Sequence, residues 1–130
     1  MTTSPSSDAL TTWLEGYKRV WEEKDPEGAA SLFTGDATYA WGPYEEPLRG
    51  RDAIRARWAE VTAAQSDVTF ASEPLGSTDS GGGIAHWNCA FNVEAPRIEL
   101  DGIFIVTLTE DGLCSDFREW WNERTSADDN

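Results

Sequence analysis

The first half of the chain repeats apolar residues at helical spacing. Residues 7–25 carry their apolar side chains three and four positions apart, at Leu10, Trp13, Leu14, Tyr17, Val20 and Trp21. That is the period of one face of a helix, so we predict a helix there. A second, short helix is expected over residues 25–36, with Asp25 as its cap. Residues 37–41 read as a strand, and residues 49–65 repeat the helical period at Ile54, Trp58 and Val61.

The second half of the chain alternates between apolar and polar residues. Four strands are expected over residues 66–75, 83–93, 98–109 and 113–123, with turn residues between them. Three helices followed by mostly antiparallel strands predict an α+β fold with helices on one face of a curved sheet. At 130 residues the chain is expected to be one domain, 1–130, with a core of about 8–124 and loosely held ends.

The composition narrows the class of partner. The net charge is −14, with 10 basic against 24 acidic residues, which argues against a nucleic-acid partner. No apolar run is long enough to span a membrane, and the first residues lack the pattern of a secretion signal. Cys89 and Cys114 form no metal pattern, and because no secretion signal is seen, reduced thiols in the cytoplasm are expected. Seven tryptophans favour a cavity or an interface.

One carboxylate lies in an unusual setting near the end of the chain. In "DFREWWNER", residues 116–124, strand alternation places Glu119 on the same face as Phe117 and Trp121. Arg118 and Trp120 then occupy the other face. Either the face with Glu119 is an ordinary surface, or it lines a pocket in which the acid acts.

The order of elements and several segments resemble the nuclear transport factor 2-like superfamily, and within it the SnoaL-like and ketosteroid isomerase-like small proteins. The resemblance covers residues 8–124 and rests on "EEKDPEGAASLFTGDATYAW", "LRGRDAIRARW", "LDGIFIVTL" and "DGLCSDFREWW". It implies a cone-shaped, cystatin-like barrel in the order α-β(1)-α-β(4), with a ligand cavity between the helices and the concave sheet face. It also implies homodimers formed through the outer sheet face.

The catalytic residues of ketosteroid isomerases have only a partial match in this chain. Tyr17 matches the first-helix tyrosine that donates to the oxyanion in those enzymes. The positions of their general-base aspartate and second acid fall on Trp41 and near Phe104. Steroid isomerisation is therefore not expected.

Limonene epoxide hydrolases offer a second comparison. The arginine and aspartate of that family correspond to His86 and Asn88, its last-strand aspartate to Glu119, and its tyrosine to Tyr39. Because this chain lacks the charged arginine–aspartate pair of that family, epoxide hydrolysis itself is not expected. If His86 and Asn88 share the cavity face with Glu119, a histidine and a carboxylate can divide acid and base roles. Trp87, Cys89 and Trp120 are then expected on the outer face.

These comparisons give a defined set of candidates. The expected catalytic residues are Glu119 and His86, and the expected substrate-binding residues are Tyr17, Tyr39, Trp41, Trp58, Asn88, Phe104, Phe117 and Trp121. The expected function is cofactor-independent, metal-free acid–base chemistry on a hydrophobic, oxygenated small molecule: cyclisation, dehydration, isomerisation or hydration. The alternatives are a binding domain without chemistry and a dimerisation module whose cavity is filled. Each candidate also has an ordinary structural role: Glu119 paired with an arginine, His86 in a structural network, and Tyr17 in the core.

Overall fold

Three helices and six strands make up the described part of the chain, residues 5–42, 44–79, 82–93 and 97–125 of this computed structural model. The helices are α1 (Pro5–Glu22), α2 (Pro26–Ser31) and α3 (Arg51–Thr62). The strands are β1 (Phe33–Ala40), β2 (Leu48–Arg49), β3 (Ser66–Ser77), β4 (Gly82–Asn92), β5 (Ile98–Leu108) and β6 (Cys114–Thr125). The predicted α+β class is confirmed. The expected loose ends include residues 1–4 and 126–130, which lie outside the described residues.

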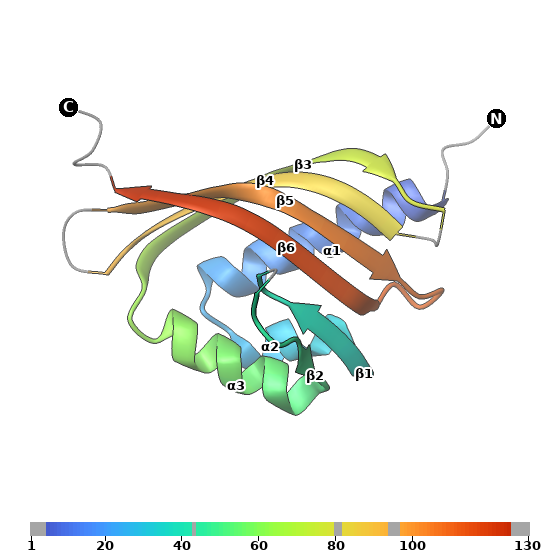
Figure 1. Ribbon diagram of the computed structural model, residues 1–130, viewed down its shortest axis with the longest axis horizontal. Coiled ribbons are helices and arrows are strands. Elements are labelled where there is room, and N and C mark those ends of the chain that lie inside the picture. The colour runs from blue at the N-terminus through green and yellow to red at the C-terminus, as the bar shows by residue number, and fades with distance from the viewer. Residues whose placement is uncertain (1–4, 43, 80–81, 94–96, 126–130) are drawn as a thin grey trace.

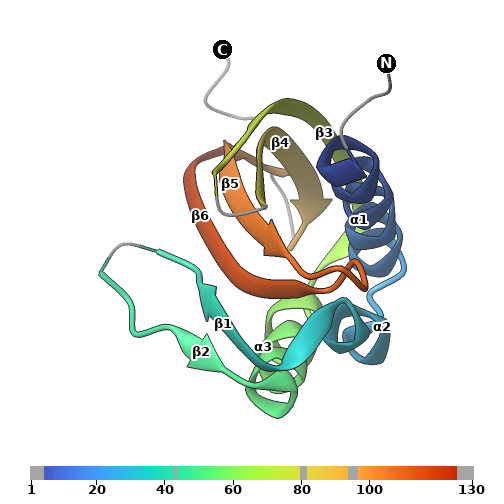
Figure 2. The same cartoon turned by 90° about the vertical axis from the view of Figure 1, so that its right-hand side faces the viewer.

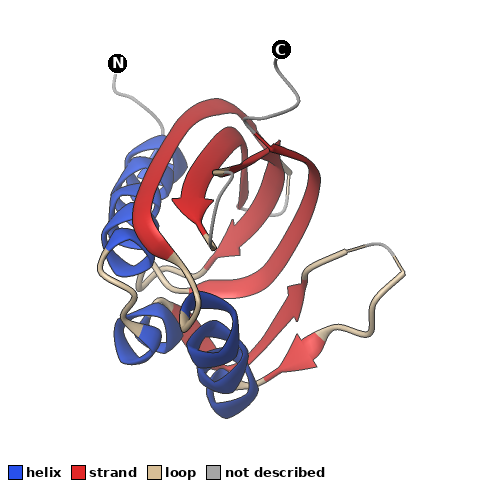
Figure 3. Cartoon of the chain, turned by 90° about the vertical axis from the view of Figure 1, so that its left-hand side faces the viewer, coloured by secondary structure: helices blue, strands red, loops and turns tan. Residues whose placement is uncertain are grey.

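The strands form one sheet in the order β2-β1-β6-β5-β4-β3. All neighbours are antiparallel except β1 and β6, which pair in parallel with Tyr39 beside Phe117. Strands β3 to β6 are long and curved, and α1 runs along the concave face (Figure 1). Seen from the two ends, the sheet curls and the helices gather on one side of it (Figures 2 and 3). The short strand β2 was not predicted, because two residues are too few to show alternation.

Local signals set several element boundaries. The Asp25 carboxylate accepts a hydrogen bond of 3.0 Å from the backbone N–H of Gly28, and Pro26 occupies the first turn of α2. The predicted cap is therefore confirmed. Helix α3 instead starts after Gly50, whose φ of 88° is easily reached only by glycine.

Aromatic rings dominate the core between α1 and the sheet. Tyr17, fully buried in the middle of α1, lies 5.0 Å from the ring of Trp13, 5.2 Å from Phe104 and 5.3 Å from Trp58. These contacts join the long helix to α3 and to β5. The helical stripe and the inner sheet face thus form one continuous cluster.

The prediction for β4 was wrong about which face points inward. Trp87 and Cys89 lie inside, at 1% and 2% exposure. His86 and Asn88 lie on the outer face. In register, His86 is opposite Ile103, which is itself opposite the exposed Trp120.

The physical reason is the hydrophobic pattern of the strand itself. The inner row, residues 83, 85, 87, 89 and 91, is Gly, Ala, Trp, Cys and Phe, whereas the outer row contains the histidine and two asparagines. Burying the apolar row gains more free energy than burying the polar row. The positional match to the epoxide hydrolase pattern therefore placed the wrong row of β4 inward, since neighbouring strand residues point to opposite faces.

Among the described residues, no helix combines the length and the apolar character needed to cross a membrane.

Candidate functional site

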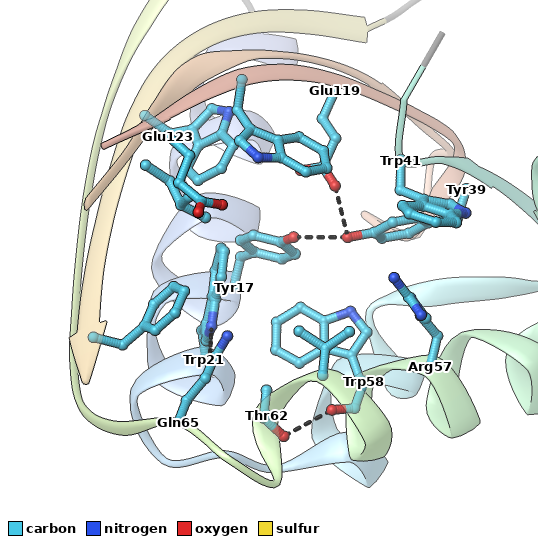
Figure 4. Close-up of a pocket in the computed structure, with 15 residues that line it drawn as sticks. Tyr17, Trp21, Tyr39, Trp41, Arg57, Trp58, Thr62, Gln65, Glu119 and Glu123 are labelled. Carbon is cyan, nitrogen blue, oxygen red and sulfur yellow. Dashed lines mark hydrogen bonds between the residues drawn. The ribbon is translucent and has the colours of Figure 1, made fainter. Parts of the chain in front are cut away.

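A cavity of about 210 Å³ opens between α1, α3 and the inner face of the sheet (Figure 4). Its lining residues are Tyr17, Trp21, Tyr39, Trp41, Arg57, Trp58, Val61, Thr62, Gln65, Trp87, Phe91, Leu100, Glu119, Trp121 and Glu123. Most of this wall is aromatic, as in sites that bind flat or ring-shaped organic molecules.

Most of the predicted site residues meet at this cavity. Those that line it are Glu119, Tyr17, Tyr39, Trp41, Trp58 and Trp121. Phe104 and Phe117 are fully buried one layer behind. Their rings lie 5.2 Å from Tyr17 and 4.5 Å from Tyr39, respectively, so they hold the tyrosines in place and do not line the cavity.

His86 and Asn88 are absent from the lining, because both lie on the outer face of the sheet. The His86 ring bridges two acids there: Nδ1 is 3.2 Å from Glu73 Oε1, and Nε2 is 3.1 Å from Asp101 Oδ1. The expected convergence of His86 and Glu119 was wrong, since the two residues are on opposite faces of the sheet.

Sequence reasoning missed nine lining residues: Trp21, Arg57, Val61, Thr62, Gln65, Trp87, Phe91, Leu100 and Glu123. Two of these residues could have been found from their spacing in the sequence. Glu123 lies two strand periods after Glu119, and Thr62 lies one helical turn after Trp58. Gln65 follows the end of α3 and carries no pattern that marks it.

The polar centre of the cavity is a chain of three side chains (Figure 4). Tyr39, on β1, donates a hydrogen bond of 3.3 Å to Glu119 Oε2, and the Tyr17 hydroxyl lies 3.1 Å from that of Tyr39. Because the proton of Tyr39 points to the carboxyl group, Tyr17 donates to Tyr39. Both phenolic protons are therefore used within the chain of three.

Burial controls the acidity of Glu119, which is 7% exposed. Desolvation raises the pKa of its carboxyl group from 4.5 to about 8, and the hydrogen bond from Tyr39 offsets only part of that rise. Among the described residues, no cation pairs with this carboxyl group. At neutral pH the group therefore mostly retains its proton.

The hydroxyl groups of Tyr17 and Tyr39, unlike the carboxyl group of Glu119, do not exchange their protons near neutral pH. Burial, followed by the neighbouring charge of Glu119, raises the pKa of Tyr39 well above 10, and burial together with Tyr39 does the same for Tyr17. Both hydroxyls thus remain protonated at neutral pH. They donate hydrogen bonds, whereas Glu119 can exchange a proton near neutral pH.

A single cation lines the described cavity, and it is already engaged. The Arg57 guanidinium lies 4.2 Å above the centre of the Trp41 ring, and its Nη1 is 2.8 Å from Glu60 Oε1. A cation over an aromatic face is an attractive contact. Arg57 therefore fixes one edge of the aromatic wall.

Metal ligands are not assembled in the described residues: they contain no group of three or more His, Cys, Asp or Glu side chains that could hold an ion. Cys89 and Cys114 are free and buried. Burial raises the pKa of the Cys89 thiol well above its ordinary value and that of the Cys114 thiol to about 12, which makes both thiols poor nucleophiles.

Comparison with protein families gives a match over most of the chain. The model of the SnoaL-like domain matches residues 14–117. A search of curated proteins finds no significant match.

Solved structures share the fold at low sequence identity. A candidate isomerase from Bacillus subtilis is 22% identical with a TM-score of 0.78, over 92% of this chain and 90% of that one. RV0760c from Mycobacterium tuberculosis is 18% identical with a TM-score of 0.80, over 96% and 100%. SalBIII, an epoxide hydrolase/cyclase-like enzyme in salinomycin pyran ring formation, is 21% identical with a TM-score of 0.75, over 89% and 92%. At these identities the comparisons establish the fold alone.

Proposed function

This chain is a member of the SnoaL-like domain family, and we propose that it is a cofactor-independent enzyme that uses Glu119 for acid–base chemistry on a hydrophobic, oxygenated small molecule. The observation that carries the proposal is a buried, uncharged carboxyl group on the wall of an aromatic cavity. Acids with a pKa near the working pH are the most effective proton donors and acceptors.

In the proposed reaction Glu119 first gives its proton to a substrate oxygen. That oxygen is a leaving hydroxyl in a dehydration, or a carbonyl in an isomerisation or cyclisation. The resulting carboxylate then takes a proton from a substrate carbon, which restores the acid and forms the C=C bond of a dehydration, the new C–C bond of a cyclisation or the dienol of an isomerisation. In the isomerisation the dienol becomes the conjugated ketone when Glu119 protonates its γ carbon and takes back the proton of the enol oxygen. Tyr39 stabilises the carboxylate in between through its hydrogen bond to Oε2, with Tyr17 behind it.

Aromatic side chains would position the substrate. Trp41, Trp58 and Trp121 line the cavity, and their flat apolar rings suit a flat molecule with one or a few oxygen atoms. RV0760c has also been solved with an estradiol hemisuccinate. That complex supports ring-shaped ligands for this fold as part of our proposal.

The test compares wild type with Glu119→Gln and with Glu123→Gln. Glu123 lies on the same strand face as Glu119 and also lines the cavity, but it is exposed. The substrates are cyclic β-hydroxyketones and β,γ-unsaturated ketones, and the readout is the absorbance of the conjugated enone. We expect Glu119→Gln to lose activity by at least about 100-fold, with ligand affinity retained, and Glu123→Gln to stay active. Full activity in Glu119→Gln would remove the carboxyl group from the mechanism.

A binding protein without chemistry is the second candidate. The observation that favours it is the position of His86 outside the cavity, which leaves Glu119 without the expected acid–base partner. In this case a ligand would quench tryptophan emission, and it would be recovered unaltered after long incubation.

We also propose a homodimer formed through the outer sheet face, as the family resemblance implies, and a cytoplasmic location, in keeping with two free cysteines. The exposed Trp120 on the outer face supports the first of these proposals.

A further inference from the structure

A buried amide side chain lies in the wall of the cavity beyond the end of α3. Gln65, between α3 and β3, lines the cavity and is 4% exposed. Both polar groups of its backbone are held: the N–H donates to the Thr62 carbonyl at 3.0 Å, and the carbonyl accepts from Lys24 Nζ at 2.7 Å. The side chain of Gln65 therefore extends from a fixed point of the chain.

A neighbouring tryptophan sets the orientation of the Gln65 amide. Trp21 Nε1 lies 2.9 Å from Gln65 Oε1. An indole nitrogen can only donate, so the amide oxygen must face Trp21 and the amide nitrogen is turned to the other side. Figure 4 shows this nitrogen pointing toward the space between Trp21 and Trp58. The hydrogen bond from Trp21 thus occupies the acceptor of the amide and directs its donor into the cavity.

The amide nitrogen of Gln65 is both unpaired and accessible. Among the described residues, Nε2 of Gln65 has no hydrogen-bond acceptor. The fully enclosed side-chain nitrogen and oxygen atoms that lack a partner there are Nε1 of Trp41 and Nε1 of Trp87. Nε2 of Gln65 is not one of these enclosed atoms, so it retains accessible surface, and because the residue lines the cavity and is otherwise buried, that surface faces the cavity. A ligand can therefore reach this donor, whereas it cannot reach the two enclosed indole nitrogens.

Glu119 and Gln65 lie at opposite ends of the cavity, with Tyr17 and Trp58 among the aromatic side chains between them (Figure 4). A ring molecule with an oxygen atom facing Glu119 would thus place its far end near the Gln65 amide. An apolar group at that end would exclude water from the amide nitrogen without replacing its hydrogen bond, which costs binding free energy. An acceptor oxygen at that end would supply the missing hydrogen bond.

We propose that Gln65 is a substrate-binding residue, and that its amide N–H donates to a second oxygen atom of the substrate, at the end of the ring system remote from the oxygen that faces Glu119. This inference rests on the proposed function of the cavity and narrows its substrate class to neutral ring compounds with an acceptor oxygen at each end. A compound without the remote oxygen leaves the amide donor unpaired, and such unpaired groups are a strong basis for discrimination.

The test uses two neutral bicyclic ketones with one carbon skeleton: decalone, and the decalindione that has a second carbonyl on its other ring. Calorimetric titration compares wild type with Gln65→Met, which removes the amide at similar length. The matched control is Thr62→Val, which removes a hydroxyl of the same wall whose proton is already donated to the Trp58 carbonyl at 2.7 Å. We expect wild type to bind the dione about fivefold more tightly, and this preference to disappear in Gln65→Met. Thr62→Val should change both affinities by the same factor and keep the preference.

An unchanged preference in Gln65→Met, or no binding of either ketone to wild type, would overturn the proposal. Gln65→Met leaves the Trp21 N–H without its acceptor, so if this variant does not fold, the assigned side-chain amide resonances of Gln65 in wild type give the answer. They should move downfield with the dione and not with decalone, and equal shifts with both ketones would speak against the proposal.

Binding of these ketones requires no turnover, so this inference and the enzymatic proposal can fail separately. A protein that keeps the Gln65-dependent preference but lacks activity loses only the enzymatic proposal. An active protein whose preference does not depend on Gln65 loses only the inference about the second oxygen.

Discussion

Glu119 is the site residue whose position the sequence predicted best. Alternation along β6 placed its carboxyl group on the face of Phe117 and Trp121, and the structure confirms that face as the inner one. Its proton-bound state could not be predicted, because it depends on burial by residues from α1, α3 and β1. Tyr39, its hydrogen-bond partner, is 80 positions away in the sequence.

The raised pKa of Glu119 makes stability depend on pH. The folded protein holds the proton up to about pH 8, whereas an unfolded chain releases it near about pH 4.3. The stabilisation is therefore fully present below the unfolded pKa, and it is lost as the pH rises through the folded pKa. We expect wild type to lose on the order of 3 kcal/mol of unfolding free energy through this group between about pH 5 and about pH 8.

Urea unfolding of wild type and Glu119→Gln across this range checks the prediction. The amide does not titrate, so the variant should gain stability relative to wild type as the pH rises. A difference between the two proteins that stays constant with pH would contradict a neutral, buried carboxyl group.

At the scale of elements, β4 shows what a strand pattern can and cannot decide. Its two rows of side chains are told apart by hydrophobicity, so the inward position of Trp87 could be read from the sequence. The positional match to the limonene epoxide hydrolase pattern gave the opposite result, because it placed the polar residues of β4 in the cavity although the alternate row is the apolar one. The helices were easier to predict, since their stripes repeat over several turns.

The outer face of β4 gives a second pH-dependent prediction. Hydrogen bonds that the imidazole donates to the carboxylates of Asp101 and then Glu73 raise the pKa of His86 above 6.5. The charged imidazole thus helps to connect β3, β4 and β5 at pH values below the unfolded pKa, and this contribution is lost as the pH rises through the folded pKa. The side chain is 34% exposed, so solvent screens the effect.

A proton NMR titration of the single histidine measures this directly. We expect a midpoint above 6.5 in wild type and a lower one in Asp101→Asn. Because His86 lies outside the cavity, His86→Gln should leave ligand affinity unchanged. A clear loss of affinity in that variant would show that the outer face communicates with the site.

At the scale of the whole molecule, the two faces of the sheet have different proposed uses. The inner face carries the cavity, and the outer face carries Trp120, 42% exposed, opposite Ile103. The sequence predicted this division for β6, where Trp120 and Trp121 point to opposite faces. The cavity volume and the hydrogen bond between Tyr39 and Glu119 were not predictable from the sequence. Both depend on how the whole sheet curves and brings distant strands together.

The dimer proposal leads to a prediction for these adjacent tryptophans. Trp120→Ser should weaken self-association about 10- to 100-fold, since large aromatic residues dominate interface energies. Trp121→Ser should leave association unchanged and weaken ligand binding, because Trp121 lines the cavity. Sedimentation velocity measures the first effect and fluorescence titration the second. A wild-type protein that stays monomeric at about 100 µM would contradict the dimer.

The parallel pairing of β1 with β6 has a consequence for how the protein folds. Tyr39 on β1 and Glu119 on β6 are 80 positions apart in the sequence, so the polar centre forms only when these two strands pair. Until then the chain exposes the aromatic side chains that line the cavity in the folded protein. A folding intermediate in which β6 is not yet paired is thus expected to expose apolar surface and to aggregate more readily than the native protein.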